Sequence, residues 1–156
     1  GEATRRQLLS FRHDGVTVFA RLMAQVARDI LPEGKTVLVM PVPLHRRRLR
    51  TRRFNQAGLL ATVIARELEL TVDHLSLQRI RPTPSQRGAS VTERARRVSG
   101  AFAVSAGTTL QNTHILLVDD VLTTGATLLA CARVLRKAGA AWVGGLTLAR
   151  VLKETS

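Results

Sequence analysis

Cysteine and aromatic residues are scarce in this chain of 156 residues. The single cysteine, Cys131, can form neither an internal disulfide nor a cysteine metal site, so nothing here requires an oxidising compartment. Because it falls in an apolar helical pattern, we interpret it as a small core residue and not as a nucleophile. Aromatic residues make up only 3% of the chain, with no tyrosine and one tryptophan. This scarcity weakens the case for a protein that holds single-stranded nucleic acid by stacking bases.

Long apolar runs are also missing. No run approaches the roughly 20 residues that a membrane-spanning helix needs, and no basic-then-apolar leader opens the sequence. We therefore expect a cytoplasmic protein without membrane insertion. The length predicts a single domain over residues 1–156. Since the chain begins with Gly1 and not with Met, we also expect that it could be a trimmed part of something longer.

Acidic residues are few, and the 11 that occur stand against 24 basic ones, which leaves a net charge of +13. This excess predicts an anionic partner or substrate, namely phosphates, nucleic acid or both. Arginine dominates over lysine, which suits bidentate contacts to phosphate. The alternative is an arginine-rich composition of the whole proteome, in which case the surplus charge is merely solvated.

The segment His114–Thr127, with the sequence HILLVDDVLTTGAT, carries the strongest functional signal. Its apolar residues Ile115–Val118 predict a short buried strand. Two carboxylates, Asp119 and Asp120, follow directly. A loop of small residues comes next, and an apolar helical pattern then begins at Leu128. The loop and the first turn of the helix offer backbone N–H groups to an anion.

This order of features predicts a site for a sugar phosphate. Gly125 lets the backbone approach a phosphate closely, and threonine hydroxyls add donors. The carboxylates of Asp119 and Asp120 repel phosphate but accept hydrogen bonds from ribose hydroxyls, with a divalent cation nearby to balance the charge. The alternative is an ordinary strand–turn–helix with an aspartate cap.

A second candidate feature is the basic stretch PVPLHRRRLRTRRFNQA over residues 41–57, which follows a predicted strand at Thr36–Met40. Pro41 and Pro43 are expected to end ladder pairing and to stiffen the turn. Open α/β sheets bind ligands where their strands end, so the stretch predicts a pyrophosphate clamp. A solvated basic turn and a nucleic-acid patch remain alternatives, as does an exposed loop histidine for His45. The predicted clamp consists of Pro43, Leu44, His45, Arg46, Arg48, Arg50 and Arg52.

Hydrophobic periodicity predicts helices over residues 16–31, 54–70 and 125–137, with a further basic helix near 92–97. Strands are expected at residues 36–40, 76–80, 100–104, 114–120 and 141–149. This alternation favours an α/β fold with a parallel sheet and helices on both faces. The polar, proline-punctuated region 71–110 is either a hood or mobile loop closing over the substrate or a plain surface loop. Further candidate contacts are Asn55, Gln56, Arg79, Arg81 and Gln86.

The segment His114–Thr127 resembles the signature of the type I phosphoribosyltransferases, which bind 5-phosphoribosyl-1-pyrophosphate (PRPP). The resemblance implies the Rossmann-like fold of that family. It also implies that Asp119 and Asp120, as catalytic residues, hold the ribose 2′- and 3′-hydroxyls. Mg²⁺ would arrive with PRPP and lie near this pair, without a dedicated protein site. The 5′-phosphate would be held by Leu122, Thr123, Thr124, Gly125, Ala126 and Thr127.

Further segments narrow the resemblance to the ComF family, the phosphoribosyltransferase-like proteins of bacterial DNA uptake and competence. In order after the basic stretch they are QRIRPTPSQ, ERARRVSGAF and AWVGGLTLAR. Three departures stand out: Arg53 replaces a usual glycine, Arg97 replaces a usual asparagine, and the four-cysteine zinc module of many members is absent. The resemblance implies PRPP and Mg²⁺ binding, with phosphoribosyl transfer to an unknown acceptor. The alternatives are a non-catalytic PRPP- or nucleotide-binding regulator, and a competence accessory protein that handles single-stranded DNA or contacts the competence machinery.

Overall fold

The computed structural model of the protein describes residues 17–44, 56–81, 90–122 and 125–150. A helix over residues 17–30 precedes the first strand, β1. In chain order, the labelled elements are β1 (Val37–Pro41), α3 (Gln56–Leu68), β2 (Thr71–Val72), β3 (Leu77–Arg79), α4 (Val91–Val98), β4 (Phe102–Val104), β5 (His114–Leu122), α5 (Ala126–Lys137) and β6 (Trp142–Arg150). The helices and main strands predicted from periodicity are confirmed, and β2 was not predicted.

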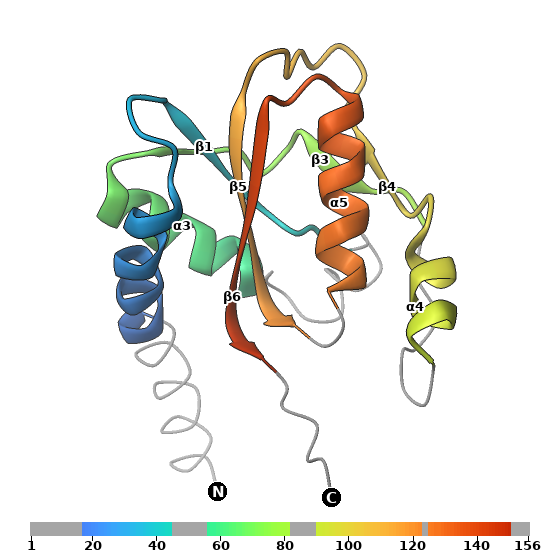
Figure 1. The fold of residues 1–156 in the computed structure, drawn as a ribbon, viewed down its shortest axis with the longest axis horizontal. Helices are drawn as coiled ribbons and strands as arrows, with labels where there is room; N and C mark the ends of the chain where they lie inside the picture. Colours follow the sequence, from blue (N-terminus) through green and yellow to red (C-terminus); the bar gives the residue numbers. More distant parts are fainter. Residues whose placement is uncertain (1–16, 45–55, 82–89, 123–124, 151–156) are drawn as a thin grey trace, which may run out of the picture.

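The main sheet has four parallel strands in the order β2-β1-β5-β6 (Figure 1). The strand β5, which carries the acidic pair, lies between β1 and β6, with Leu116 opposite Val39 and Leu117 opposite Gly145. Its run of apolar residues is typical of a strand that is buried on both faces of a parallel sheet. The predicted parallel sheet is therefore confirmed, and the predicted acidic motif lies on a central strand.

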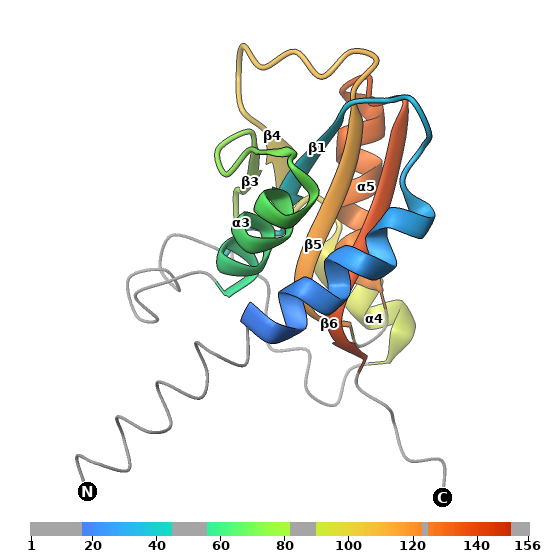
Figure 2. The ribbon, with the colours of Figure 1, turned by 90° about the vertical axis from the view of Figure 1, so that its left-hand side faces the viewer.

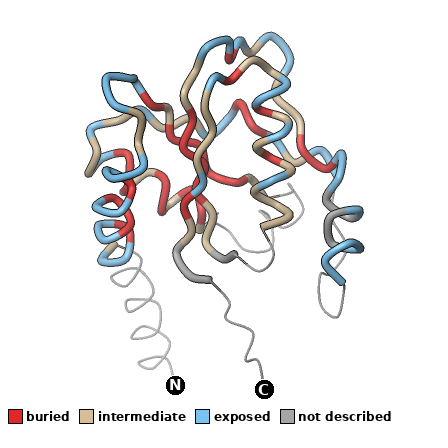
Figure 3. The backbone as a smooth tube through the Cα atoms, in the orientation of Figure 1, coloured by how far each residue is buried: buried red, intermediate tan, exposed pale blue. Residues whose placement is uncertain are grey.

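Helices cover both faces of this sheet, as Figure 2 shows with the helix over 17–30 and α3 in front and α5 behind. Successive side chains of a strand point to opposite faces. Val39 and Leu116 pack on the side of α3, and Met40 and Leu117 pack on the side of α5. The buried parts of the chain consequently lie on the central strands and on the helices that cover them (Figure 3).

The short strands β3 and β4 form a separate antiparallel pair, with Leu77 opposite Val104 and Arg79 opposite Phe102. The sequence predicted both strands but not that they leave the main sheet. Residues 73–76 alone separate β2 from β3, and a parallel crossover needs a dozen or more residues. The chain therefore leaves the main sheet, and Leu77 and Phe102 pack on the same side of it as α5.

Candidate functional site

The acidic pair Asp119–Asp120 lies in the last half of β5, where Asp119 is opposite Thr147 of β6. Both residues are half-buried. The backbone N–H of Asp120 donates a hydrogen bond to Oδ1 of Asp119 at 2.9 Å. The central strand thus holds two adjacent carboxylates at the edge of the sheet where ligands of α/β folds bind.

Burial is the largest cause of the raised pKa of Asp119, and together with the side chain and negative charge of Asp120 it brings that pKa to about 7. The backbone N–H of Asp120 and the positive charge of Arg79 act in the opposite direction. Two neighbouring carboxylates with unbalanced negative charge form a donor set that fits a divalent cation, because such ions prefer oxygen ligands. They equally suit hydroxyl groups, which donate to them.

Three residues lie between the end of β5 and the start of α5, and the last of them, Gly125, is the N-terminal cap of the helix. Gly125 adopts φ 80° and ψ 0°, in the left-handed region that glycine enters without strain. The cap makes no side-chain hydrogen bond to the helix, and Thr127 is half-buried in the first turn. The positive end of the α5 dipole therefore faces the loop that follows the acidic pair.

The segment after β1 reaches the same edge of the sheet. Pro41 still pairs with Val118, and the N–H of Val42 donates to the carbonyl of Val118 at 2.8 Å. The expectation that Pro41 ends the ladder is therefore wrong, because proline loses only its own donor and the next residue continues the pairing. Pro43 and Leu44 follow, and both are half-buried.

Several predicted site residues lie outside the described residues, and their assigned contacts stay predictions. Gln56 is described as the first residue of α3 and is half-buried, and Leu122 is described as the last residue of β5. The residues outside the described ranges are His45, Arg46, Arg48, Arg50, Arg52, Asn55, Gln86, Thr123 and Thr124.

Two arginines of the 71–110 region, Arg79 and Arg81, have different environments. The guanidinium carbon of Arg79 lies 4.7 Å from the centre of the Phe102 ring, and its charge acts on Asp119. The guanidinium of Arg81 instead donates to the carbonyl of Ser99. The sequence analysis predicted the same role, a possible contact to the substrate, for both arginines, because nothing in their spacing distinguishes them.

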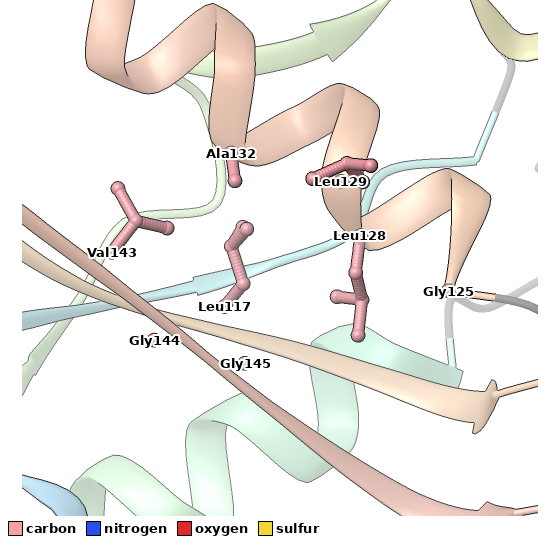
Figure 4. A pocket seen from close by; sticks show the side chains of 8 residues that line it. All are labelled: Leu117, Gly125, Leu128, Leu129, Ala132, Val143, Gly144 and Gly145. Atoms are coloured by element: carbon pink, nitrogen blue, oxygen red, sulfur yellow. The ribbon is translucent and has the colours of Figure 1, made fainter. Parts of the chain in front are cut away.

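An apolar groove of about 270 Å³ runs between α5 and the strands β5 and β6 (Figure 4). The described residues that line it are all apolar or glycine, which does not suit a phosphate or a ribose. Gly125 belongs both to this groove and to the predicted phosphate loop. The lining residues are Leu117, Gly125, Leu128, Leu129, Ala132, Val143, Gly144 and Gly145.

Two kinds of feature are absent from the described ranges. No helix there is long and apolar enough to span a membrane. No group of three or more histidine, cysteine, aspartate or glutamate side chains there could hold a metal ion.

A parallel sheet with an acidic pair on its central strand and a glycine-led helix directly after it defines a phosphoribosyltransferase fold. The model of the family described as "Phosphoribosyl transferase domain" matches residues 55–156, and the chain belongs to this family. Among solved structures, an allosteric regulatory enzyme of purine biosynthesis superposes with a TM-score of 0.57 at 18% identity, over 88% of this chain and 26% of that one. A hypoxanthine phosphoribosyltransferase from Staphylococcus aureus gives 0.52 at 15% identity, over 86% and 62%. These likenesses concern the fold.

The sequence relatives confirm the narrower resemblance to the ComF family. "Competence protein F" of Haemophilus influenzae is 34% identical over 128 residues, which are 77% of this chain and 54% of that protein. "Competence protein ComFC" of Bacillus subtilis is 34% identical over 143 residues, or 90% and 56%. "DNA utilization protein YhgH" of Escherichia coli K12 is 37% identical over 114 residues, or 73% and 49%. The chain thus spans about half the length of these relatives.

Proposed function

We propose that this domain binds PRPP together with Mg²⁺ and transfers the phosphoribosyl group to an acceptor. The observation that carries the proposal is the acidic pair in the last half of β5, with the N-terminus of α5 following at Ala126, after the three residues that separate the strand from the helix. One ligand that carries a ribose and a phosphate matches both halves of this arrangement. The relatives' names suggest a setting of competence and DNA utilisation.

Asp119 and Asp120 would accept hydrogen bonds from the ribose 2′- and 3′-hydroxyls. Backbone N–H groups between Leu122 and Thr127 would hold the 5′-phosphate, with the α5 dipole adding to the attraction. The pyrophosphate would then extend toward the basic stretch that follows Val42, the residue whose N–H donates to the carbonyl of Val118 on β5.

In the transfer, the bond between C1 of the ribose and the pyrophosphate oxygen breaks, and a bond from C1 to the acceptor nucleophile forms. The acceptor's proton leaves to a base, and pyrophosphate departs with the bonding electrons. Mg²⁺ would neutralise charge on the departing pyrophosphate. Fixed donors and charges stabilise such developing charge without covalent help from the protein.

Calorimetric titration with PRPP, with and without Mg²⁺, tests the proposal. The wild type is compared with the double variant Asp119→Ala/Asp120→Ala. A matched control, Asp29→Asn/Glu33→Gln, also removes two negative charges, at exposed positions in and after the helix over 17–30. We expect Mg²⁺-dependent binding in the wild type and the control, and loss of binding in the double variant. Absence of binding in the wild type, or equal binding in all three proteins, would overturn the proposal.

Turnover is a separate question from binding. If PRPP binds but no pyrophosphate is released with any acceptor, the domain is a PRPP-binding regulator. A second candidate function, handling of single-stranded DNA, is favoured by the net charge of +13 and by the names of the relatives.

A further inference from the structure

Arg79 connects the β3–β4 pair to the acidic pair on the main sheet. It is the last residue of β3 and lies opposite Phe102 of β4. Phe102 is only 4% exposed and packs in the same core cluster as Leu117, two residues before Asp119 on β5. The half-buried guanidinium of Arg79 is thus held against the cluster from which Asp119 extends.

The position of the guanidinium is fixed by its neighbours. Its carbon lies 4.7 Å from the centre of the Phe102 ring, a favourable distance for a cation over an aromatic face. The strand pairing continues one residue further, where the N–H of Ile80 donates to the carbonyl of Ala101 at 2.8 Å. A charge held in this way does not need to be ordered when a ligand arrives.

The charges around Asp119 explain why a fixed cation matters there. Asp120 adds a second carboxylate next to Asp119, and among the described residues Arg79 is a positive group that acts on Asp119. Arginine keeps its charge throughout the working pH range, so its effect on the acidic pair is constant.

We propose that Arg79 is a built-in counter-ion of Asp119 and a positioning residue that reduces the amount of Mg²⁺ needed for PRPP binding. This inference rests on the proposed function. PRPP carries several negative charges, and two bare carboxylates repel it. Arg79 supplies part of the compensating positive charge from the protein itself, and Mg²⁺ supplies the rest.

Removal of the positive charge of Arg79 should change the affinities for Mg²⁺ and for PRPP in opposite directions. In Arg79→Met, Mg²⁺ alone should bind more tightly, because the acidic pair has lost a competing cation. PRPP binding at low Mg²⁺ should weaken, and the Mg²⁺ concentration for half-maximal PRPP binding should rise. We expect each of these dissociation constants and the half-maximal Mg²⁺ concentration to change by roughly three- to tenfold, the range of one partly exposed charge pair. General damage to the site would weaken the binding of both Mg²⁺ and PRPP.

The test is calorimetric titration of Mg²⁺ alone, and of PRPP at a series of Mg²⁺ concentrations. Arg28→Met is the matched control, because it also removes one arginine charge, at an exposed position whose guanidinium donates to the carbonyl of Glu67. Arg79→Lys keeps the charge and should restore most of the wild-type behaviour. If Arg79→Met has the Mg²⁺ dependence of the wild type, the inference is wrong.

A second variant covers the case in which Arg79→Met does not fold. Phe102→Leu keeps Arg79 but removes the ring beneath it, and it should raise the Mg²⁺ requirement in the same direction by a smaller factor. An unchanged requirement in that variant would overturn the inference. Failure of the wild type to bind PRPP at any Mg²⁺ concentration would instead overturn the proposed function.

Discussion

The backbone N–H of Asp120 donates to Oδ1 of Asp119 at 2.9 Å, so the strand itself holds two adjacent carboxylates together. Burial and the charge of Asp120 raise the pKa of Asp119 to about 7. The acidic pair therefore costs stability in the unliganded protein, and a cation or a hydroxyl-bearing ligand would relieve that cost. Functional sites commonly contain titratable groups perturbed in this way.

Asp119→Asn should stabilise the protein at high pH and have little effect at low pH. Asp119 has a folded pKa of about 7 and an ordinary value of 3.8, so the folded state binds its proton more tightly. The cost of ionising it in the fold is absent below about pH 4, grows as the pH rises, and is complete above about pH 7. Asparagine mimics the protonated form and avoids this cost.

The measurement is thermal unfolding of both proteins at pH 5 and pH 8. We expect the difference in melting temperature, variant minus wild type, to be a few degrees larger at pH 8 than at pH 5. For a chain of this size, 1 kcal/mol corresponds to about 2–4 °C. Asp29→Asn, at an exposed position, serves as the control. A difference that stays constant with pH would show that Asp119 does not carry this charge cost.

The sequence predicted the three long strands of the main sheet, β1, β5 and β6, because each contains a run of apolar residues, whereas the two-residue strand β2 carries no such signal. The run Ile115–Val118 and the helical pattern after Gly125 need no long-range information, and both are confirmed. The pairing of β3 with β4 could not be predicted, since strands of three residues carry no signal for their partner. The proximity of Arg79 to Asp119 was equally invisible, because 40 positions separate them and only the tertiary fold brings them together.

Cys131 should be inert to thiol reagents in the folded protein. Its side chain is fully buried, and burial raises the pKa of the thiol well above its usual range. We expect no reaction with a chromogenic disulfide reagent at pH 8 until the protein is unfolded. Rapid stoichiometric labelling of the native protein would refute the interpretation of Cys131 as a core residue.

Two substitutions at the same site provide an energetic check on that interpretation. Cys131→Ala leaves a small cavity, whereas Cys131→Ser places a hydroxyl in an apolar cluster with Leu117 and Leu135. Serine should therefore destabilise the protein more than alanine, by roughly 1–3 kcal/mol, the cost of an unsatisfied buried polar group. Urea unfolding of the two variants measures this difference, and equal stability would contradict it.

Gly144→Ala and Gly145→Ala should differ in stability although the residues are neighbours on β6. A Cβ at Gly144 would lie 2.8 Å from Cζ2 of Trp142, so the indole ring would have to move. A Cβ at Gly145 would lie 3.3 Å from the flexible end of Leu128, which can shift into the open groove. We expect a loss of about 1–3 kcal/mol for the first variant and less than about 1 kcal/mol for the second.

Urea unfolding followed by tryptophan fluorescence tests this pair, because Trp142 is the only tryptophan of the chain. The native emission should also change in Gly144→Ala and stay constant in Gly145→Ala. Equal stability and equal spectra would mean that the indole ring does not pack over Gly144.

Loss of the acidic pair should affect the binding of single-stranded DNA and the binding of PRPP differently. The net charge of +13 favours an electrostatic contact with DNA, and the low aromatic content leaves few stacking platforms. Binding of a short oligonucleotide should therefore depend steeply on salt. With about five phosphate contacts, the affinity should fall roughly 10²-fold between 50 and 200 mM salt.

Removal of two negative charges in Asp119→Ala/Asp120→Ala should leave DNA affinity equal or higher while it abolishes PRPP binding. Fluorescence anisotropy of a labelled oligonucleotide measures the first effect, and calorimetry measures the second. Parallel loss of both ligands would mean that they share the acidic pair, and DNA would then have to be considered a ligand of the phosphoribosyl site itself.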